Sequence, residues 1–349
     1  MGAALFALGG GRSALLLHAH HLVVDMVSWR ILLDDLATAY GQLERGEAAA
    51  LPAKTTSYRA WAEHLEAYAG TPGARRQLAA WTRIADLPRT PLPADLPAGE
   101  DTRVADRTLT RTLGREWTRA LLRDVPRRHR AQVHHALLAA LGRAVAGWTG
   151  SGGVLVAVEG HGREPLFDGV DLSRTVGWFT ALAPVHLDVR AAEAPGAALA
   201  RVRDALDALP DRGLGHGVLR HLSRDAEVAA AIRALPEPEV TFNYLGQLDQ
   251  SFSGDALLAP SGWSAGRQVS QRNGRFTGLY VSAPVLRDEL RVSFGYSAAR
   301  FHAETIEALA ERFAGALSAL VEDRATFPNA NLSPEDLGRV LARGRRRSR

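Results

Sequence analysis

The sequence predicts an α/β (α+β) protein built in two lobes, and three observations lead to this class. Apolar runs typical of strands alternate along the chain with segments that have helical spacing. Residues 88–102 contain four of the 17 prolines, which suits neither a helix nor a central strand and predicts a linker between the lobes. A length of 349 residues with 46% hydrophobic side chains is enough to form two cores.

Before the Pro-rich stretch the chain is expected to hold one strand and three helices. Residues 14–24 are mostly apolar and end in β-branched side chains, a run too short for a core helix, so they predict a buried strand. Residues 26–45 change to apolar side chains spaced three and four apart, which predicts an amphipathic helix. Two further helices are predicted at residues 58–69 and 74–86.

After the Pro-rich stretch, strands and helices alternate again. Strands are predicted by short apolar or alternating runs and helices by 3.6-residue periodicity. Leu290, Val292 and Phe294 alternate with polar neighbours in the second strand of a hairpin, and Ile306 and Leu309 begin the apolar stripe of the last helix. The predicted elements are a strand at 107–113, a helix at 130–147, strands at 154–158 and 239–244 with a helix at 195–208 between them, a hairpin at 276–283 and 289–296, and a helix at 303–322.

Composition excludes several classes of function. The chain has no cysteine, which rules out disulfides, thiolate nucleophiles and Cys-ligated zinc. Lys54 is the only lysine and follows no Gly-rich loop, so Schiff-base chemistry and a P-loop NTPase do not fit. The net charge of +4 depends on five arginines within residues 343–349, which removes the composition argument for nucleic-acid binding. Without a membrane span, an export signal or a lipidation motif, a cytoplasmic protein with no membrane partner is expected.

The densest group of candidate residues is His18-Ala-His20-His21, followed by Asp25 and Ser28. A histidine at the end of a buried strand is rigidly held, and His21 is a candidate general base. In a strand, His18 and His20 share one face and His21 takes the other, which is poor geometry for a metal site, and no metal is expected. The residues alone leave open that these are core histidines with Asp25 as a helix N-cap.

Two further positions carry candidate chemistry. Glu159 ends a buried strand and is followed by two glycines that allow a sharp turn; burial would raise its proton affinity, which suits a base. An ordinary ion pair with a nearby arginine is equally open. Asn243 and Tyr244 end another strand, on opposite faces, and either side chain is able to donate a hydrogen bond to a developing oxyanion. A core tyrosine and a turn asparagine are the alternative.

As an ordered set, these motifs resemble the epimerization domain of nonribosomal peptide synthetases, a member of the condensation-domain superfamily with the chloramphenicol acetyltransferase-like fold. Condensation domains proper carry other residues at the second and third motifs. The matching segments are His20-His21-x-x-x-Asp25 with Ser28 and Trp29, Glu159-Gly-His161-Gly-Arg163-Glu164, Arg174-Thr-Val-Gly-Trp178-Phe179-Thr180, Pro210-x-x-Gly213-x-Gly215-x-Gly217 and Phe242-Asn-Tyr-Leu-Gly246.

The resemblance implies inversion of the Cα configuration of an aminoacyl or peptidyl thioester on the 4′-phosphopantetheine arm of a carrier protein, without a cofactor bound by the domain itself. His21 and Glu159 would be the two bases, with Tyr244 and Asn243 near the thioester oxygen. The implied partners are the carrier domain and adjacent adenylation and condensation domains. The site would be supported by His20, Asp25, Arg163 and Trp29, with Asp25 paired to Arg163, and the substrate tunnel would be lined by Met26, Ser28, His161, Arg174, Trp178 and Phe179.

The resemblance also sets the expected domain boundaries. Residues 1–87 would form a partial N-terminal lobe, because the family has a long segment before the histidine motif and only 19 residues precede His20 here. Residues 88–102 would be the linker, 103–332 the C-terminal lobe, and 333–349 an exit linker with an Arg-rich tail.

Two other functions stay open at this point. One is an inactive, truncated remnant that serves only as a scaffold or docking piece. The other is a condensation-type acyltransferase that forms an amide bond, against which the Glu159 motif argues because that reaction needs no second base. A further departure from the family pattern is Met26, which replaces a glycine and would narrow or redirect the tunnel.

Overall fold

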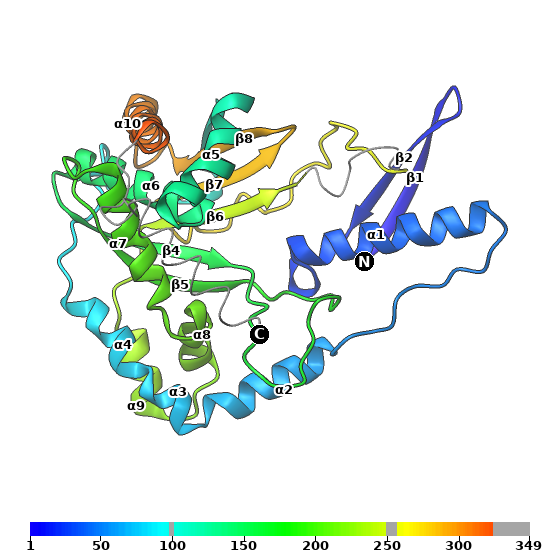
Figure 1. Ribbon diagram of the computed structural model, residues 1–349, viewed down its shortest axis with the longest axis horizontal. Coiled ribbons are helices and arrows are strands. Elements are labelled where there is room, and N and C mark those ends of the chain that lie inside the picture. Colours follow the sequence, from blue (N-terminus) through cyan, green and yellow to red (C-terminus); the bar gives the residue numbers. More distant parts are fainter. Residues whose placement is uncertain (98–100, 249–256, 324–349) are drawn as a thin grey trace, which may run out of the picture.

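A six-stranded mixed sheet forms the centre of the protein, in a computed structural model that describes residues 1–97, 101–248 and 257–323. The strand order is β3-β8-β7-β6-β4-β5 (Figure 1). Neighbours β4, β6 and β7 run parallel, and the other adjacent pairs are antiparallel. The strands are β3 (Asp106–Leu113), β4 (Gly153–Gly160), β5 (Ala181–Asp188), β6 (Val240–Gln247), β7 (Leu279–Leu286) and β8 (Glu289–Ser297). The predicted α/β class is confirmed.

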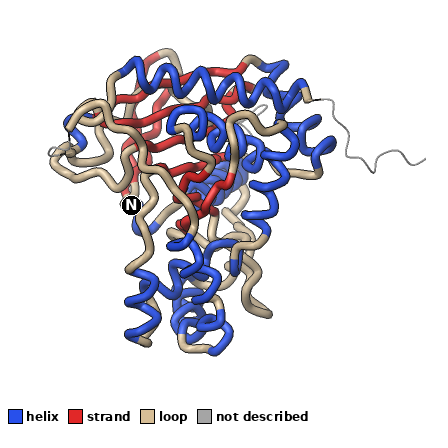
Figure 2. Tube along the Cα trace, turned by 90° about the vertical axis from the view of Figure 1, so that its left-hand side faces the viewer, coloured by secondary structure: helices blue, strands red, loops and turns tan. Residues whose placement is uncertain are grey.

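Helices cover one face of this sheet and bury the main core against it. These helices are α5 (Arg115–His129), α6 (Val133–Thr149), α7 (Pro195–Asp207) and α10 (Ala303–Glu322). Figure 2 shows the strands in red with helices in blue packed over them. Leu138 of α6, Val281 of β7 and Phe294 of β8 are fully buried in this core. Because strand side chains alternate in direction, every second residue of these strands lies on the opposite face of the sheet.

A second set of helices packs near β4 and β5 on that opposite face. It comprises α2 (Tyr58–Ala69), α3 (Pro72–Arg76), α4 (Leu78–Thr82), α8 (Leu214–His221) and α9 (Ala226–Arg233). The 3₁₀ turns η2 (Arg83–Asp86), η3 (Arg103–Ala105) and η4 (Pro210–Gly213) lie elsewhere along the chain. Trp81 packs in one cluster with Leu155 and Ala183, and Trp61 in another with Phe179. Residues 58–86 therefore share their cores with segments that follow the Pro-rich stretch.

The first 44 residues lie to one side of the large sheet (Figure 1). They form an antiparallel hairpin of β1 (Gly2–Gly9) and β2 (Arg12–His18), the single turn η1 (His21–Val23) and the long helix α1 (Met26–Glu44). Arg30 of α1 joins this part to the sheet, because its Nη2 donates to the carbonyl oxygen of Gln247 over 3.0 Å.

Several predicted boundaries are wrong. The strand predicted at 14–24 ends at His18, where the chain turns toward η1, and the helix predicted at 74–86 is divided into α3, α4 and η2. The helix predicted at 130–147 is α6, while β1, β5, α5, α8 and α9 were not predicted. Pro184 interrupts the strand pattern of β5, which tolerates it as an edge strand, and Pro126 lies inside α5. The predicted exit linker and tail lie outside the described residues from 324 onward.

Between residues 87 and 97, the described part of the Pro-rich stretch contains no helix or strand. This stretch passes beside the beginnings of β4 and β6. Thr90 N donates to the Gly153 carbonyl over 3.4 Å, and Leu92 N donates to the Glu239 carboxylate over 2.8 Å. Within the described ranges, no helix is both long enough and apolar enough to cross a membrane.

Candidate active site

A cavity of about 250 Å³ lies where the start of α1 meets the carboxyl ends of β4 and β6. Three segments that are far apart in the sequence contribute to its wall, and each carries one of the motifs identified above. The lining residues are Asp25, Met26, Val27 and Arg30 from the α1 region, Glu159, Gly160, His161 and Thr180 from β4 and the loop after it, and Asn243, Tyr244, Leu245 and Gly246 from β6.

Glu159 is held in this cavity by the register of the sheet. It lies directly opposite Asn243 in the parallel pairing of β4 with β6, on the face away from the main core. The Asn243 amide Nδ2 donates to Glu159 Oε2 over 2.5 Å. Burial raises the pKa of the Glu159 carboxyl above its usual value, although a hydrogen bond from Tyr280 and the nearby His21 charge both act to lower it. The site therefore holds a carboxyl group whose proton affinity is higher than usual, which favours a role in general acid–base chemistry.

Asn243 and Tyr244 both line the cavity, although adjacent strand residues normally point to opposite faces. Tyr244 packs against the main core, as Phe242 does, and β6 has a β-bulge at this place. Asn243 pairs with Ser282 of β7 but Gly246 pairs with Pro284, so β6 has one extra residue between the two pairs. Gly246 takes a left-handed φ of 69° at this place. The prediction that the two side chains point to opposite faces is confirmed, because Tyr244 packs against the main core and Asn243 points toward Glu159.

His20 and His21 do not occupy the strand positions that were predicted for them. After β2 ends, His20 becomes the N-cap of η1, because its Nδ1 accepts the backbone N–H of Leu22 over 3.1 Å. The exposed side chain of His21 lies in η1 beside Trp178, with ring centroids 5.2 Å apart. His21 is not among the residues lining the cavity, but its charge acts on the Glu159 carboxyl.

Asp25 and Arg163 form a buried, two-bonded ion pair, as the sequence led us to expect. Arg163 Nη1 donates to Asp25 Oδ2 over 2.5 Å and Nη2 to Oδ1 over 3.1 Å, with side chains only 8% and 6% exposed. Asp25 also caps α1 by accepting the Ser28 N–H over 2.7 Å, and it accepts the Phe179 N–H over 3.2 Å. The Arg163 guanidinium also lies 4.0 Å from the centre of the Phe179 ring. The pair joins α1 to the loop after β4.

Of the six residues expected to line a tunnel, Met26 and His161 line the cavity. Ser28 and Phe179 do not line this cavity, because both are buried in the protein interior. Ser28 Oγ is used in a pair of hydrogen bonds with the backbone of Gly177, at 2.9 and 3.0 Å, which fixes the motif loop against α1.

Arg174, Trp178 and Trp29 also lie outside the cavity lining. Arg174 forms an ion pair with Asp35 of α1. Trp178 is largely exposed beside His21, and its carbonyl oxygen accepts the Tyr58 hydroxyl over 2.8 Å. Trp29 is half-buried in the first turn of α1, where its backbone N–H donates to the Asp25 carbonyl oxygen over 3.0 Å.

Tyr280 is a site residue that the sequence analysis missed. It lies on β7, on the same sheet face as Asn243, with its hydroxyl oxygen 3.4 Å from Asn243 Nδ2, and hydrogen bonding by this hydroxyl acts to lower the pKa of Glu159. The alternation of apolar residues in β7 places Tyr280 opposite the core positions Leu279 and Val281, a signal that was present in the sequence. Its proximity to Glu159, however, depends on the pairing of β4, β6 and β7.

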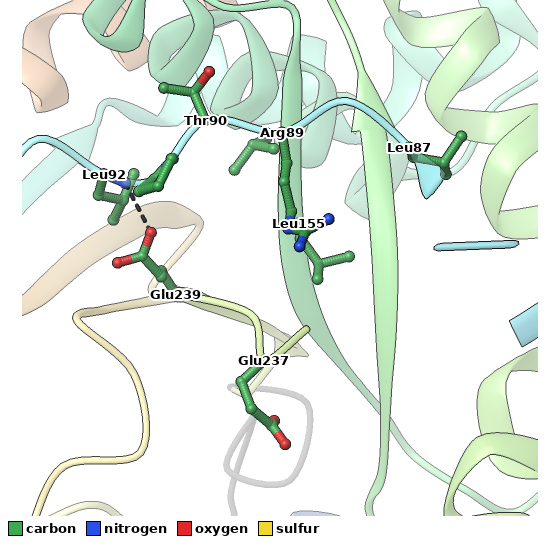
Figure 3. A pocket seen from close by; sticks show the side chains of 9 residues that line it. Leu87, Arg89, Thr90, Leu92, Leu155, Glu237 and Glu239 are labelled. Atoms are coloured by element: carbon green, nitrogen blue, oxygen red, sulfur yellow. Dashed lines mark hydrogen bonds between the residues drawn. The ribbon is translucent and has the colours of Figure 1, made fainter. Parts of the chain in front are cut away.

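A larger cavity, of about 660 Å³, lies at the other end of the strands and is shown in Figure 3. The Pro-rich stretch from Leu87 to Leu92 forms one wall, and Glu237 and Glu239 lie on another. Both glutamates are already in ion pairs, with Arg220 and Arg300 respectively. This cavity also borders the beginning of β4, whereas Glu159 is near its end, about 15 Å away at the rise of a strand. The candidate chemistry therefore belongs to the smaller cavity.

Among the described residues, no group of three or more His, Cys, Asp or Glu side chains is arranged to hold a metal ion. The site offers instead the half-buried carboxyl of Glu159, the imidazole of His161, and amide and phenol groups as hydrogen-bond donors. Such a set is suited to moving protons on a substrate whose reaction develops negative charge on oxygen.

Comparisons with known proteins lead to the same superfamily as the motifs. The family model of the condensation domain matches residues 1–336. The chain is 42% identical over 336 residues to one of the subunits of linear gramicidin synthase from Brevibacillus parabrevis, covering 96% of this chain and 6% of that protein. It is 37% identical over 329 residues to surfactin synthase subunit 2 of Bacillus subtilis (strain 168), covering 93% and 9%. The chain thus spans less than a tenth of the length of either relative.

A solved structure matches the fold over most of the chain. The crystal structure of the epimerization domain from the third module of tyrocidine synthetase B aligns with a TM-score of 0.84 and 35% sequence identity, covering 92% of this chain and 71% of that one. The extent of the family match, the sequence identity and the shared fold lead to one conclusion. The chain belongs to the condensation-domain family.

Proposed function

We propose that this chain inverts the Cα configuration of an aminoacyl or peptidyl thioester carried on the 4′-phosphopantetheine arm of a carrier protein. The observation that carries the proposal is Glu159. It is a half-buried carboxyl with a raised pKa, held by Asn243 in a cavity and influenced by the charge of His21. Similarity to the tyrocidine synthetase epimerization domain supports the same choice within the family.

The reaction uses the two bases in sequence. One of Glu159 and His21 takes the Cα proton, and the electron pair moves onto the thioester carbonyl to give an enolate. The other, in its protonated form, then returns a proton to the opposite side of Cα, so that both configurations are reached. Donor groups of Asn243 and Tyr244 stabilise the enolate oxygen, and closure of the site around the arm strengthens these interactions by excluding water.

The other members of the motif set act through structure in this proposal. Asp25 and Arg163 hold the start of α1 against the loop after β4, and His20 holds η1. Met26 and His161 border the cavity that the substrate enters. The proposal assigns no cofactor and no metal to the domain itself, and its partners are a carrier domain with the adenylation and condensation domains of the same assembly line.

The direct test is solvent deuterium exchange at Cα. A carrier protein loaded with an aminoacyl-phosphopantetheine thioester is incubated with the chain in D₂O, and deuterium in the released amino acid is measured by mass spectrometry. We expect exchange with the unaltered chain and loss of at least about 100-fold in the Glu159→Gln and His21→Ala variants. Glu63→Gln, which changes an exposed glutamate on α2, is the matched control. No exchange above that of carrier protein alone would contradict the proposal.

Amide-bond formation is the second candidate, because the family model that matches is that of the condensation domain as a whole. The same incubation tests it when a second, acceptor-loaded carrier protein is added. A dipeptidyl thioester without Cα exchange would identify a condensation catalyst. Cα exchange without a new amide bond supports the epimerization proposal.

A further inference from the structure

Tyr280 is the polar group nearest to Glu159 that the proposed reaction has not used. Its ring lies on the open face of β7 and is 37% exposed. The hydroxyl oxygen lies 3.4 Å from the amide nitrogen of Asn243, which in turn donates to the Glu159 carboxylate, and hydrogen bonding by the Tyr280 hydroxyl acts to lower the pKa of Glu159. Three side chains from three adjacent strands thus form one hydrogen-bonded group at the edge of the cavity.

The donor and acceptor roles within this group follow from its chemistry. Asn243 Nδ2 donates to Glu159 Oε2 over 2.5 Å and also points its second N–H toward the Tyr280 oxygen. An ionised carboxylate accepts hydrogen bonds only, so the Tyr280 hydroxyl must be the donor in its contact with Glu159. Accepting from Asn243 leaves the phenolic proton directed toward the carboxylate.

We propose that Tyr280 is a positioning residue for the general base, and that its hydroxyl donates to Glu159 so as to keep the carboxylate ionised and fixed in one orientation. This inference rests on the proposed function, because it gives Glu159 the role of a base. Tyr280 itself does not line the cavity and is not assigned contact with the reacting atoms.

Two opposing effects make this donor necessary. Burial removes water from Glu159 and raises the pKa of its carboxyl, which favours the protonated form that is unable to act as a base. A hydrogen bond to the charged form acts in the opposite direction, and bonds to ionised groups are stronger than neutral ones. Tyr280 therefore offsets part of the effect of burial without filling the cavity.

The same contact should affect Tyr280. Its pKa is raised by burial first, and then by the negative charge and hydrogen bond of Glu159. The phenol consequently keeps its proton over the whole range in which Glu159 titrates, and it is a donor at every pH that matters for the reaction. A tyrosinate, which would repel the carboxylate, does not form under those conditions.

The test removes the donor with Tyr280→Phe and strengthens it by incorporating 3,5-difluorotyrosine at position 280. The pKa of Glu159 is read by NMR from ¹³C-carboxyl-labelled glutamate, with Glu159→Gln identifying the resonance. We expect the pKa of Glu159 to rise in Tyr280→Phe and to fall with difluorotyrosine, while Tyr40→Phe, an exposed tyrosine on α1, leaves it unchanged. This readout does not require activity, so it separates failure of this inference from failure of the proposed function.

The pH dependence of Cα exchange gives the second readout. In Tyr280→Phe the pH profile of the rate should shift to higher pH, so that the rate falls on the acidic side of the profile while the rate at the alkaline plateau is retained. A merely structural role would lower the rate by the same factor at every pH. An unchanged pKa of Glu159 in both position-280 variants, with the fold intact by circular dichroism, would overturn the inference.

Discussion

Replacing Asp25 should destabilise the fold strongly, because Asp25 is the centre of a buried polar network. Its carboxylate accepts both guanidinium nitrogens of Arg163 and the backbone N–H groups of Ser28 and Phe179. Asp25→Ala leaves the arginine buried and 8% exposed without its counter-charge. Breaking a buried pair in this way typically lowers the free energy of unfolding by about 3–5 kcal/mol.

Asp25→Asn is the more informative variant. The amide keeps the shape and one acceptor oxygen but loses the charge, so we expect a smaller decrease in the free energy of unfolding, of about 2 kcal/mol. Both variants are compared with Asp34→Asn, an exposed aspartate on the same helix, by urea denaturation followed by circular dichroism.

The pH dependence of this stability has a definite sign. Burial acts to raise the pKa of Asp25, but the hydrogen bonds from Arg163 and Ser28 and the arginine charge outweigh it, so the pKa lies below its usual value of 3.8. A carboxyl with a lowered pKa stabilises the fold above that usual value, and this contribution is lost as the pH falls below about 4. If Asp25→Asn retained the full free energy of unfolding and lost Cα exchange, Asp25 would act in the chemistry and the structural reasoning would be refuted.

Three further predictions follow from single contacts. Gly162→Ala should lower the free energy of unfolding by about 3 kcal/mol or more in thermal denaturation, because Gly162 has a φ of 67° and an added Cβ would lie 1.7 Å from the Phe179 carbonyl oxygen. Burial lowers the pKa of His134 and His216 to about 4. The free energy of unfolding, measured by urea denaturation, should therefore be complete above pH 6.5 and decrease by about 3 kcal/mol for each histidine as the pH falls to 4. A free energy of unfolding that does not change over this pH range would contradict the prediction. Glu159→Gln should stay within about 1 kcal/mol of the unaltered chain, since the amide oxygen still accepts from its strand neighbour, and a larger loss would show that the carboxylate is structural.

The elements with a clear hydrophobic pattern were predictable because the burial of their side chains in the fold follows that pattern. The helix predicted at 26–45 is α1, from Met26 to Glu44, and the strand predicted at 154–158 lies within β4. In both, local spacing and burial agree. Two of the missed elements contain a local feature that contradicts the pattern, Pro184 in edge strand β5 and Pro126 in α5.

The histidine motif shows a different limit. The run from Leu15 to Val24 has the composition of a strand, yet the strand ends at His18 because the His20 ring accepts the backbone N–H of Leu22 and starts a turn. A side chain that caps its own backbone competes with strand pairing. Composition alone does not reveal which of the two interactions prevails.

The cavity could be predicted only in part, since it depends on contacts between distant residues. The residues Glu159 and Asn243 were identified from their positions at strand ends, but their hydrogen bond requires that β4 pair in parallel with β6. Tyr280 joins them only because β7 pairs with β6 in turn. Sequence patterns specify which face of a strand a residue occupies, and do not specify which strand lies beside it.

The buried ion pair connects the two segments that carry the proposed bases, His21 and Glu159. His21 lies four residues before Asp25, and Glu159 lies four residues before Arg163. Each base is therefore tied by a short stretch of chain to one member of the pair, and the pair is the nearest fixed connection between the two segments. A change at Asp25 or Arg163 should thus act on exchange by altering the separation of the bases, lowering the rate by one factor at all pH values. A change at Tyr280 should act through the ionisation of Glu159 and lower the rate only at acidic pH. The two pH profiles therefore distinguish a residue that fixes the separation of the proposed bases from a residue that controls the ionisation of Glu159.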